Sequence, residues 1–433
     1  MPPSDMLRIL TISVTNPGFF ESRHDPTNNP IILWLNGGPG ASSLIGLFEE
    51  IGPCSIAGDS KSTIPNPYSW VNNASLLFLD QPAGVGLSTA KTKADIPVTL
   101  EQAAADFNLF LRTVFTQLLP QYSQNQVFVA GESFGGSYVP YFVNHILRKQ
   151  ATNSSDVYTG QISSIILVDA AVEDSNLATG LFDLLCYPPV GPKLNATACE
   201  AMAAAVPACE KKGRVCLDTY TKEDCSLDEC DVVSRWMYDN VVEGGLNPYD
   251  LRIPCHGPPV CRQGNNSSGS GSIEYYVKTL EIQRLMRLRS SDYRDINFDI
   301  NQLWADSGAA TVPTTRELSY IIDNSNVRTL IINGNYDAEV STIANMRVYD
   351  NLPWKGQASY RHEVFRDWQW IDDRDGKTRK GGQVKGVDRL FFVTVDDAGH
   401  MSPADQPQAV QRIVNSWVQQ SDIFATGKTR GPA

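Results

Sequence analysis

The sequence lacks a hydrophobic run long enough to span a bilayer, and it lacks any excess of basic residues. Its 36 Lys and Arg are outnumbered by 48 Asp and Glu, which gives a formal net charge of −12. A transmembrane helix needs about 18 or more apolar residues in a row, and capture of phosphate backbones or anionic lipids needs a basic surface. We therefore expect neither a nucleic-acid partner nor a membrane partner.

The chain also lacks an internal repeat and a readable secretory leader. Its first residues contain no positively charged segment followed by an apolar stretch and a small-residue cleavage site. We expect residues 1–29 to be an incomplete N-terminal segment. The length of 433 residues allows one large domain or two to three modules.

Cysteine is distributed unevenly along the chain. Of the nine cysteines, Cys54 stands alone and the other eight lie between Cys186 and Cys261, within 76 residues. Such clustering is typical of disulfides and of an oxidising compartment. The N-x-Ser/Thr acceptors for glycosylation agree with it and are Asn73, Asn153, Asn195, Asn265 and Asn266. The sequence therefore predicts the secretory pathway, with a vacuolar, lysosomal or extracellular destination.

Short apolar runs that end at Gly, Asp or Asn predict buried strands. These runs are 31–35, 76–79, 126–130, 162–168, 329–332 and 390–395. Residues 99–119 predict an amphipathic helix whose first residue forms a capping box with Gln102. The apolar stripe from Ala409 to Val418 predicts a second helix, started by Asp405 and Pro407. Alternating strands and helices predict an α/β fold with a mostly parallel sheet covered on both faces.

Residues 172–296 interrupt this alternation with the eight clustered cysteines, an Ala-rich stretch and a Gly/Ser/Asn tract. We interpret them as a disulfide-rich insertion, or cap, in a core made of residues 30–171 and 297–433. Eight cysteines allow 105 pairings, so spacing alone leaves the connectivity open. The charged, glycine-containing stretch 366–385 predicts a solvated hairpin, because charge runs are usually exposed faces.

The sharpest local motif is Gly131-Glu132-Ser133-Phe134-Gly135, which follows an apolar strand and precedes a segment of helical character. This is the G-x-S-x-G pattern in the setting that its chemistry requires. A serine at a tight strand-to-helix turn is exposed above the sheet edge, and small neighbours permit the bend. We predict that Ser133 is a nucleophile.

A nucleophilic serine needs a base, and the chain offers five histidines: His24, His145, His256, His362 and His400. His145 lies on the helix after the serine and His256 lies among the cysteines, so both suit structural roles better. His400 follows the last predicted strand, where an α/β-hydrolase presents its base. Asp337 follows the preceding strand, which gives the chain order Ser, Asp, His of that fold. The rival acids Asp396 and Asp397 lie too near His400 in sequence to fit that order, and we expect them to shape its loop.

The glycine loop Asn36-Gly37-Gly38-Pro39-Gly40 follows the first predicted strand of the core. Acyl transfer needs backbone N–H donors for the developing oxyanion. We predict the N–H groups of Gly38 and Phe134 as these donors. No metal or organic cofactor is expected, since disulfides explain the Cys and His spacing better than ligand sets do.

Five blocks of the sequence together resemble the signature of the serine carboxypeptidases, the group of carboxypeptidase Y and cathepsin A. The blocks are WLNGGPGASSLIGLFEEIGP (34–53), LLFLDQPAGVGLS (76–88), GESFGGSYVP (131–140), INGNYD (332–337) and AGHMSPADQP (398–407). They occur in family order and spacing, and the resemblance runs from about Phe19 almost to the C-terminus. It implies the α/β-hydrolase fold and cleavage at peptide C-termini.

The resemblance also implies how a substrate is held. In the family, residues that match Asn36, Gly37 and Glu132 bind the C-terminal carboxylate of the peptide. A second glutamate pairs with the last of these; by spacing it is Glu50, although the adjoining Glu49 is an alternative. Two carboxyls in contact share a proton because both cannot ionise cheaply. Peptidase activity is therefore expected to have an acidic optimum.

Three further residues match family positions near the substrate pockets. Glu339 and Val340 lie near the pockets for the penultimate and final residues of the peptide, and Met401 lies beside the final one. An acidic Glu339 favours a basic penultimate residue if it is partly desolvated. A solvated Glu339 is the alternative.

The cysteine spacing resembles that of four family disulfides: Cys186–Cys199, Cys209–Cys230, Cys216–Cys225 and Cys255–Cys261. Many relatives carry a further bridge where this chain has Ala41 and Ile296. Cys54 is left over, and we hypothesise that its partner belongs to a missing upstream segment.

We therefore predict a serine-type carboxypeptidase that acts on peptides and proteins through an acyl-enzyme on Ser133. The oligomeric state is left open. Two alternatives remain: an acyltransferase on the same scaffold, and an inactive product of an N-terminally truncated gene.

Overall fold

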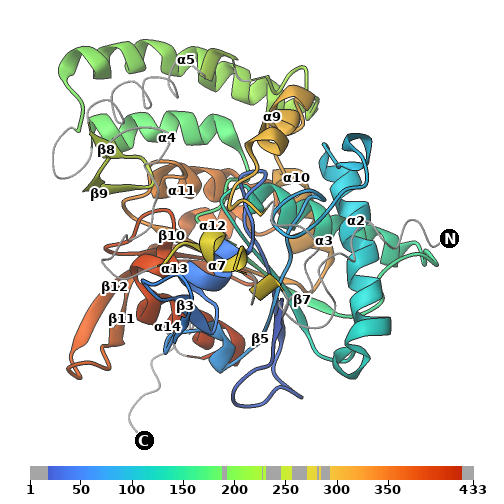
Figure 1. Ribbon diagram of the computed structural model, residues 1–433. Helices are drawn as coiled ribbons and strands as arrows, with labels where there is room; N and C mark the ends of the chain where they lie inside the picture. The colour runs from blue at the N-terminus through green and yellow to red at the C-terminus, as the bar shows by residue number, and fades with distance from the viewer. Residues whose placement is uncertain are drawn as a thin grey trace, which may run out of the picture.

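A nine-stranded sheet forms the centre of the computed structural model, which describes residues 18–187, 193–226, 228–230, 245–255, 271–279, 282–283 and 293–421 (Figure 1). The strand order is β1-β5-β2-β6-β7-β10-β13-β12-β11. Its strands are β1 Phe19–Phe20, β2 Ile31–Leu35, β5 Ser75–Phe78, β6 Val127–Glu132, β7 Ile162–Val168, β10 Arg328–Gly334, β11 Arg366–Ile371, β12 Thr378–Val387 and β13 Leu390–Val395. In this spatial order, the neighbouring strands β5, β2, β6, β7, β10 and β13 pair in parallel. Strand β1 is antiparallel to β5, and β12 is antiparallel to both β13 and β11. The predicted mostly parallel sheet is confirmed.

Helices cover both faces of this sheet. They are α2 Leu100–Thr113, α3 Gly135–Ala151, α4 Asp174–Cys186, α5 Ala196–Thr219, α7 Ile273–Val277, α9 Phe298–Ser307, α10 Thr315–Asn324, α11 Thr342–Asn351, α12 Gln357–His362, α13 Ser402–Asp405 and α14 Pro407–Gln419. Because strand residues alternate between faces, Leu33 lies in one core with α2, α3, α10 and α11, and Trp34 lies in the other with α14. Within the described part of the chain, no helix has both the length and the apolarity needed to cross a membrane.

One predicted helix start has a different cap, and another predicted helix start is wrong. The hydroxyl of Thr99 accepts the N–H of Gln102 as expected (3.3 Å), but the Gln102 side chain accepts the N–H of Val98 (3.0 Å) rather than closing the box on Thr99. Asp405 ends α13 instead of starting α14. Its carboxylate accepts the N–H of Gly399 at 2.7 Å, so this side chain serves the preceding loop.

The charged stretch 366–385 forms the predicted hairpin, but the expectation that it is solvated is wrong for part of it. Strand β12 pairs with β13, so the hairpin extends the main sheet. Lys385 is only 4% exposed; its Nζ lies 2.5 Å from Asp350 Oδ1 and 4.5 Å from the centre of the Tyr360 ring. A buried lysine needs such partners because an unpaired buried charge is costly.

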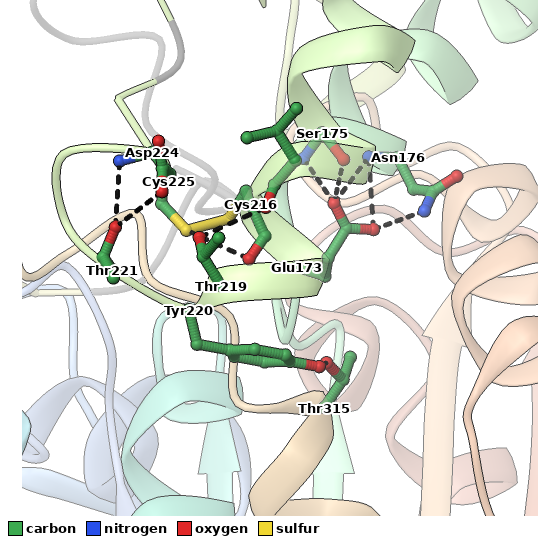
Figure 2. Close-up of a disulfide and its surroundings, with 11 residues drawn as sticks. Glu173, Ser175, Asn176, Cys216, Thr219, Tyr220, Thr221, Asp224, Cys225 and Thr315 are labelled. Atoms are coloured by element: carbon green, nitrogen blue, oxygen red, sulfur yellow. Dashed lines mark hydrogen bonds between the residues drawn. A yellow bond between two sulfur atoms is a disulfide. The ribbon is translucent and has the colours of Figure 1, made fainter.

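The cysteine-rich region contributes α4 and α5, which are stacked at one end of the molecule (green in Figure 1). Its disulfides are Cys186–Cys199, Cys209–Cys230 and Cys216–Cys225. Figure 2 shows the last of these beside the end of α5, where the Tyr220 hydroxyl lies 2.8 Å from Thr315 Oγ1 at the start of α10. The disulfides link segments within the insertion, and the contact between Tyr220 and Thr315 links the insertion to the core.

Several sequence predictions about this region are only partly covered by the described residues. Cys255 is disulfide-bonded, but its expected partner Cys261 lies outside the described residues. Cys54, at the start of a small hairpin of β3 Cys54–Ile56 and β4 Thr63–Pro65, is a free thiol. Of the predicted glycosylation acceptors, Asn153 and Asn195 are exposed, Asn73 is half-buried, and Asn265 and Asn266 lie outside the described residues.

Candidate active site

The serine of the G-x-S-x-G motif lies where β6 meets α3. Ser133 has a φ of +57°, a left-handed conformation that is rare for residues other than glycine. Its N–H donates to the carbonyl of Val168 at 3.2 Å, and its own carbonyl accepts the N–H groups of Gly136 and Ala171, each at 2.9 Å. Such a constrained strand-to-helix turn is the geometry that presents a nucleophile above a sheet edge.

The glycine loop after β2 lies directly against this turn. A Cβ placed on Gly37 would lie 2.4 Å from the backbone N of Phe134 and 2.9 Å from the Cβ of Ser133, so only glycine fits there. The next residue, Gly38, has a φ of +106°, which again favours glycine. The fold thus brings the predicted oxyanion donors Gly38 and Phe134 into the same region as Ser133.

A buried carboxylate secures the far end of the glycine loop. Asp80 Oδ1 accepts the hydroxyl of Ser42 and the N–H of Ser43, and Asp80 Oδ2 accepts the N–H of Leu87, all at 2.7 Å. Burial raises the pKa of Asp80, while these hydrogen bonds oppose the rise. The sequence offered little signal for this role beyond an acid at the end of a strand.

Ala41 and Ile296 are paired in the backbone. The N–H of Ser42 donates to the carbonyl of Asp295 at 2.8 Å, and the N–H of Asn297 donates to the carbonyl of Gly40 at 2.9 Å. Two backbone hydrogen bonds therefore join the glycine loop to the start of α9 without a covalent link.

The predicted base and acid meet at the carboxyl ends of β13 and β10. His400 Nδ1 and Asp337 Oδ2 are 2.8 Å apart, and the two side chains are 4% and 0% exposed. The other carboxylate oxygen of Asp337 accepts the N–H of Val340 at 2.9 Å. A buried, doubly held carboxylate fixes the orientation of the imidazole that it contacts.

Burial and nearby charges shift the pKa of His400 in opposite directions. Burial lowers the pKa, but the nearby carboxylates of Asp337, Asp169 and Glu339 raise it to about 9. Burial also raises the pKa of Glu339 to about 7 and that of Asp169 well above its ordinary value. As the pH falls, protonation of these carboxyls therefore weakens their contribution to the His400 pKa.

Two glutamates and an asparagine form a buried cluster beside the turn that carries Ser133. The side-chain oxygen of Asn36 accepts N–H groups from Trp34 (2.7 Å) and Gly46 (3.0 Å), so its amide group faces Glu132 Oε1 at 3.5 Å. Burial raises the pKa of Glu50 to about 7, although interactions with Glu132 and Asn36 lower it. Burial, and then the charge of Glu50, raise the pKa of Glu132 well above its ordinary value.

The structure thus places Glu50 and not the half-buried Glu49 beside Glu132. At acid pH the cluster holds one or two protons and offers hydrogen-bond donors from its carboxyls and from Asn36. Such an arrangement can receive a carboxylate that brings its own negative charge.

The predicted pocket residues lie near the Asp337 and His400 loops. Glu339 is half-buried, its Oε1 is enclosed without a hydrogen-bond partner among the described residues, and its charge acts on His400. Val340 is 4% exposed and Met401 is 6% exposed. Glu339 is therefore partly exposed and partly buried.

The other described histidines lie apart from Asp337. His145 is half-buried on α3, His362 is exposed at the end of α12, and His24 Nδ1 contacts the carbonyl of Asn72. His256 lies outside the described residues.

Sequence reasoning missed Asp169, which follows β7. It is fully buried with a φ of +45°, and its carboxylate accepts the N–H of Gly334 at 2.6 Å and that of Ser402 at 3.3 Å. These bonds reach both the Asp337 and the His400 loops. An acid directly after a buried strand was the available signal, similar to the one that predicted Asp337, which lies three residues after the end of β10.

Comparison with known proteins gives one consistent result. The sequence pattern of the serine carboxypeptidase family matches residues 18–420. Vacuolar serine-type carboxypeptidase ATG42 of Saccharomyces cerevisiae is 32% identical over 411 residues, which cover 94% of this chain and 77% of that protein. Carboxypeptidase Y homolog A of Talaromyces marneffei is 32% identical over 412 residues, which cover 92% and 69% respectively.

A solved structure is similar in fold. The crystal structure of KEX1(delta)p, a prohormone-processing carboxypeptidase from Saccharomyces cerevisiae, superimposes with a TM-score of 0.78. The two chains are 22% identical, and the match covers 93% of this chain and 86% of that one. The likeness supports the predicted α/β-hydrolase architecture.

Proposed function

The chain belongs to the serine carboxypeptidase family, and from that membership we propose that it releases C-terminal amino acids from peptides and proteins through an acyl-enzyme on Ser133. His400 takes the proton of the Ser133 hydroxyl as the oxygen attacks the last peptide carbonyl, and Asp337 stabilises the imidazolium. The N–H groups of Gly38 and Phe134 receive the oxyanion. The protonated His400 then supplies its proton to the departing amino group, and water hydrolyses the acyl-enzyme.

The observation that carries the proposal of exopeptidase action is the buried cluster of Asn36, Glu50 and Glu132 near this serine. A C-terminal carboxylate is the feature that distinguishes the last peptide bond from all others. Asn36 and Gly37 supply donors to that carboxylate, and the Glu50–Glu132 pair supplies a shared proton. The raised pKa values of both glutamates support this role, because only a protonated carboxyl can donate.

An acidic pH optimum follows from the same cluster. With a Glu50 pKa of about 7, the shared proton is present below that pH and lost above it. Each lost proton leaves a buried negative charge facing the negative substrate carboxylate, so peptide binding weakens as the pH rises.

The pocket beside Asp337 is proposed to prefer a basic penultimate residue. Glu339 is partly desolvated and its Oε1 is enclosed, so a positive side chain that reaches its ionised form gains more than it would from a solvated acid. Because burial raises the Glu339 pKa to about 7, we expect this preference to be strongest near and above that pH. Val340 and Met401 supply apolar surface near the final residue.

We further propose that the protein matures in the secretory pathway and acts in a vacuole or outside the cell. Three described disulfides support this proposal, because such bonds persist in oxidising compartments. One similar protein is described as vacuolar.

Mass spectrometry of a synthetic peptide tests the activity. The peptide is blocked at its N-terminus and offered at acid pH either as the free acid or as the C-terminal amide. We expect stepwise loss of residues from the free acid, much slower reaction of the amide, and no reaction with Ser133→Ala. Equal cleavage of both forms, or cleavage by the Ser133→Ala protein, contradicts the proposal.

A further inference from the structure

A short hairpin from the cysteine-rich region lies against both loops of the candidate triad. It consists of β8 Leu246–Asn247 and β9 Asp250–Pro254 (Figure 1). The carbonyl of Tyr249 accepts the N–H of His400 at 2.7 Å, and the carbonyl of Pro248 accepts the N–H of Ala338 at 2.9 Å. In addition, the N–H of Leu251 donates to the carbonyl of Tyr336 at 3.1 Å.

The hairpin also packs closely against the imidazole and its loop. The Tyr249 and His400 rings meet edge to face with centroids 5.4 Å apart. A Cβ on Gly399 would lie 2.3 Å from the Tyr249 carbonyl oxygen, so a larger residue would force hairpin and loop apart.

Arg252 connects the hairpin to both sides of the His400 loop. Its Nε lies 2.9 Å from Oδ1 of the fully buried Asp250, which orients the guanidinium. Its Nη1 donates to the carbonyl of Asp397, and its Nη2 lies 3.3 Å from Asp405 Oδ2. That same Asp405 oxygen accepts the N–H of Gly399 at 2.7 Å. The guanidinium therefore joins residues that precede His400 to one that follows it.

We propose that Arg252 is a positioning residue for the triad, which it serves by holding the His400 loop through Asp397 and Asp405. A planar guanidinium has several donors in a fixed arrangement, so it can satisfy three acceptors at once, which a lysine cannot do in the same geometry. Catalysis depends steeply on such placement, since a displacement of about 1 Å costs roughly 100-fold in rate. The inference rests on the proposed function of Ser133 and His400.

The test compares Arg252→Gln with Arg374→Gln. Arg374 is a matched control, because it sits two residues after the fully buried Asp372 and binds it through Nε at 2.9 Å, in the hairpin between β11 and β12. We measure kcat and KM on a peptide acid, thermal melting, and the rate at which a fluorophosphonate labels Ser133. The labelling needs an activated serine but no C-terminal carboxylate, so it reports on the triad even if the peptidase activity fails in the wild type.

For Arg252→Gln we expect kcat and the labelling rate to fall about 10- to 100-fold while KM stays within about twofold, because the carboxylate cluster is untouched. Arg374→Gln should keep both rates. Arg252→Lys should recover part of the loss, since it retains the charge but not the fork. Unchanged labelling by Arg252→Gln, or an equal loss in Arg374→Gln, overturns the inference.

A second variant keeps the test decisive if Arg252→Gln does not fold. Asp405→Asn retains an oxygen for the N–H of Gly399 but removes the ion pair with Arg252. It should also lower kcat with little change in KM. A full rate of labelling in folded Asp405→Asn and Arg252→Lys together overturns the inference as well.

Discussion

Replacing Glu132 with Gln should separate peptidase activity from esterase activity in their dependence on pH. In the wild type, Glu50 and Glu132 are buried together and both pKa values are raised, that of Glu50 from 4.5 to about 7. A shift of this size corresponds to a preference of roughly 3 kcal/mol for the neutral form. Loss of the proton places a buried charge against the substrate carboxylate in place of a hydrogen bond. A charged hydrogen bond is worth about 1.5–3 kcal/mol, which is roughly 10- to 100-fold in KM.

The assay measures KM from pH 5 to pH 8 with a peptide acid and with an ester that lacks the carboxylate. For the wild type, the peptide KM should rise by about 10-fold or more above pH 7, whereas the ester KM should stay nearly flat. In Glu132→Gln the amide donates at every pH, so the peptide KM should change by less than about threefold. Glu49→Gln serves as the matched control, because the adjoining Glu49 lies outside the pair. The same peptide slope in Glu132→Gln and wild type would refute the reasoning.

The buried pair of Glu50 and Glu132 should also make the free energy of unfolding depend on pH. For a carboxyl whose pKa is raised in the folded state, the folded protein keeps a proton that the unfolded chain releases. The free energy of unfolding should therefore fall as the pH rises from about 4.5 to about 7, and Glu132→Gln should reduce that fall. Melting temperatures at pH 5 and pH 7.5 give the comparison.

Three other predictions concern single contacts. Ala41→Cys together with Ile296→Cys should form a disulfide, because the two residues are paired in the backbone and lie close enough for the bond. The bond should raise the free energy of unfolding by about 2–4 kcal/mol. A melting curve that reductant leaves unchanged would count against it. Glu339→Leu should lower kcat/KM for a lysine over a leucine at the penultimate position, and an unchanged ratio would contradict the pocket assignment. Asp337→Asn should lower kcat on the order of 10⁴-fold with a similar KM, because His400 loses its orientation; near-normal turnover would remove Asp337 from the triad.

Local patterns were enough to predict the strands that carry the proposed triad. Each buried strand is a run of apolar residues that ends at a polar or glycine residue. Ser133 directly follows β6, and Asp337 lies three residues after β10. The chain order and the loop position identified His400 among the histidines. These features depend on residues that are close together in the sequence, so the sequence could indicate them.

Features that depend on contacts between residues far apart in the sequence could not be predicted. Lys385 belongs to a charged stretch, yet it is buried because Asp350 and Tyr360 from another part of the chain surround it. Glu49 and Glu50 are neighbours, and only the turn of the helix around them decides which is buried. The role of Arg252 depends on Asp397 and Asp405, and no local pattern in its own hairpin indicates them.

The hairpin of β8 and β9 has a consequence for the order of folding. Its contacts join residues separated by 145 and 153 positions, from Arg252 to Asp397 and Asp405. Contacts between distant positions are slow to form because the chain must close a long loop first. The pairing of β7 with β10 in the core joins residues that are similarly far apart, such as Ser164 and Arg328. Until the hairpin docks, the His400 loop lacks the Arg252 contacts. Under the proposed function, we therefore expect Ser133 to acquire its full reactivity only once this hairpin has docked.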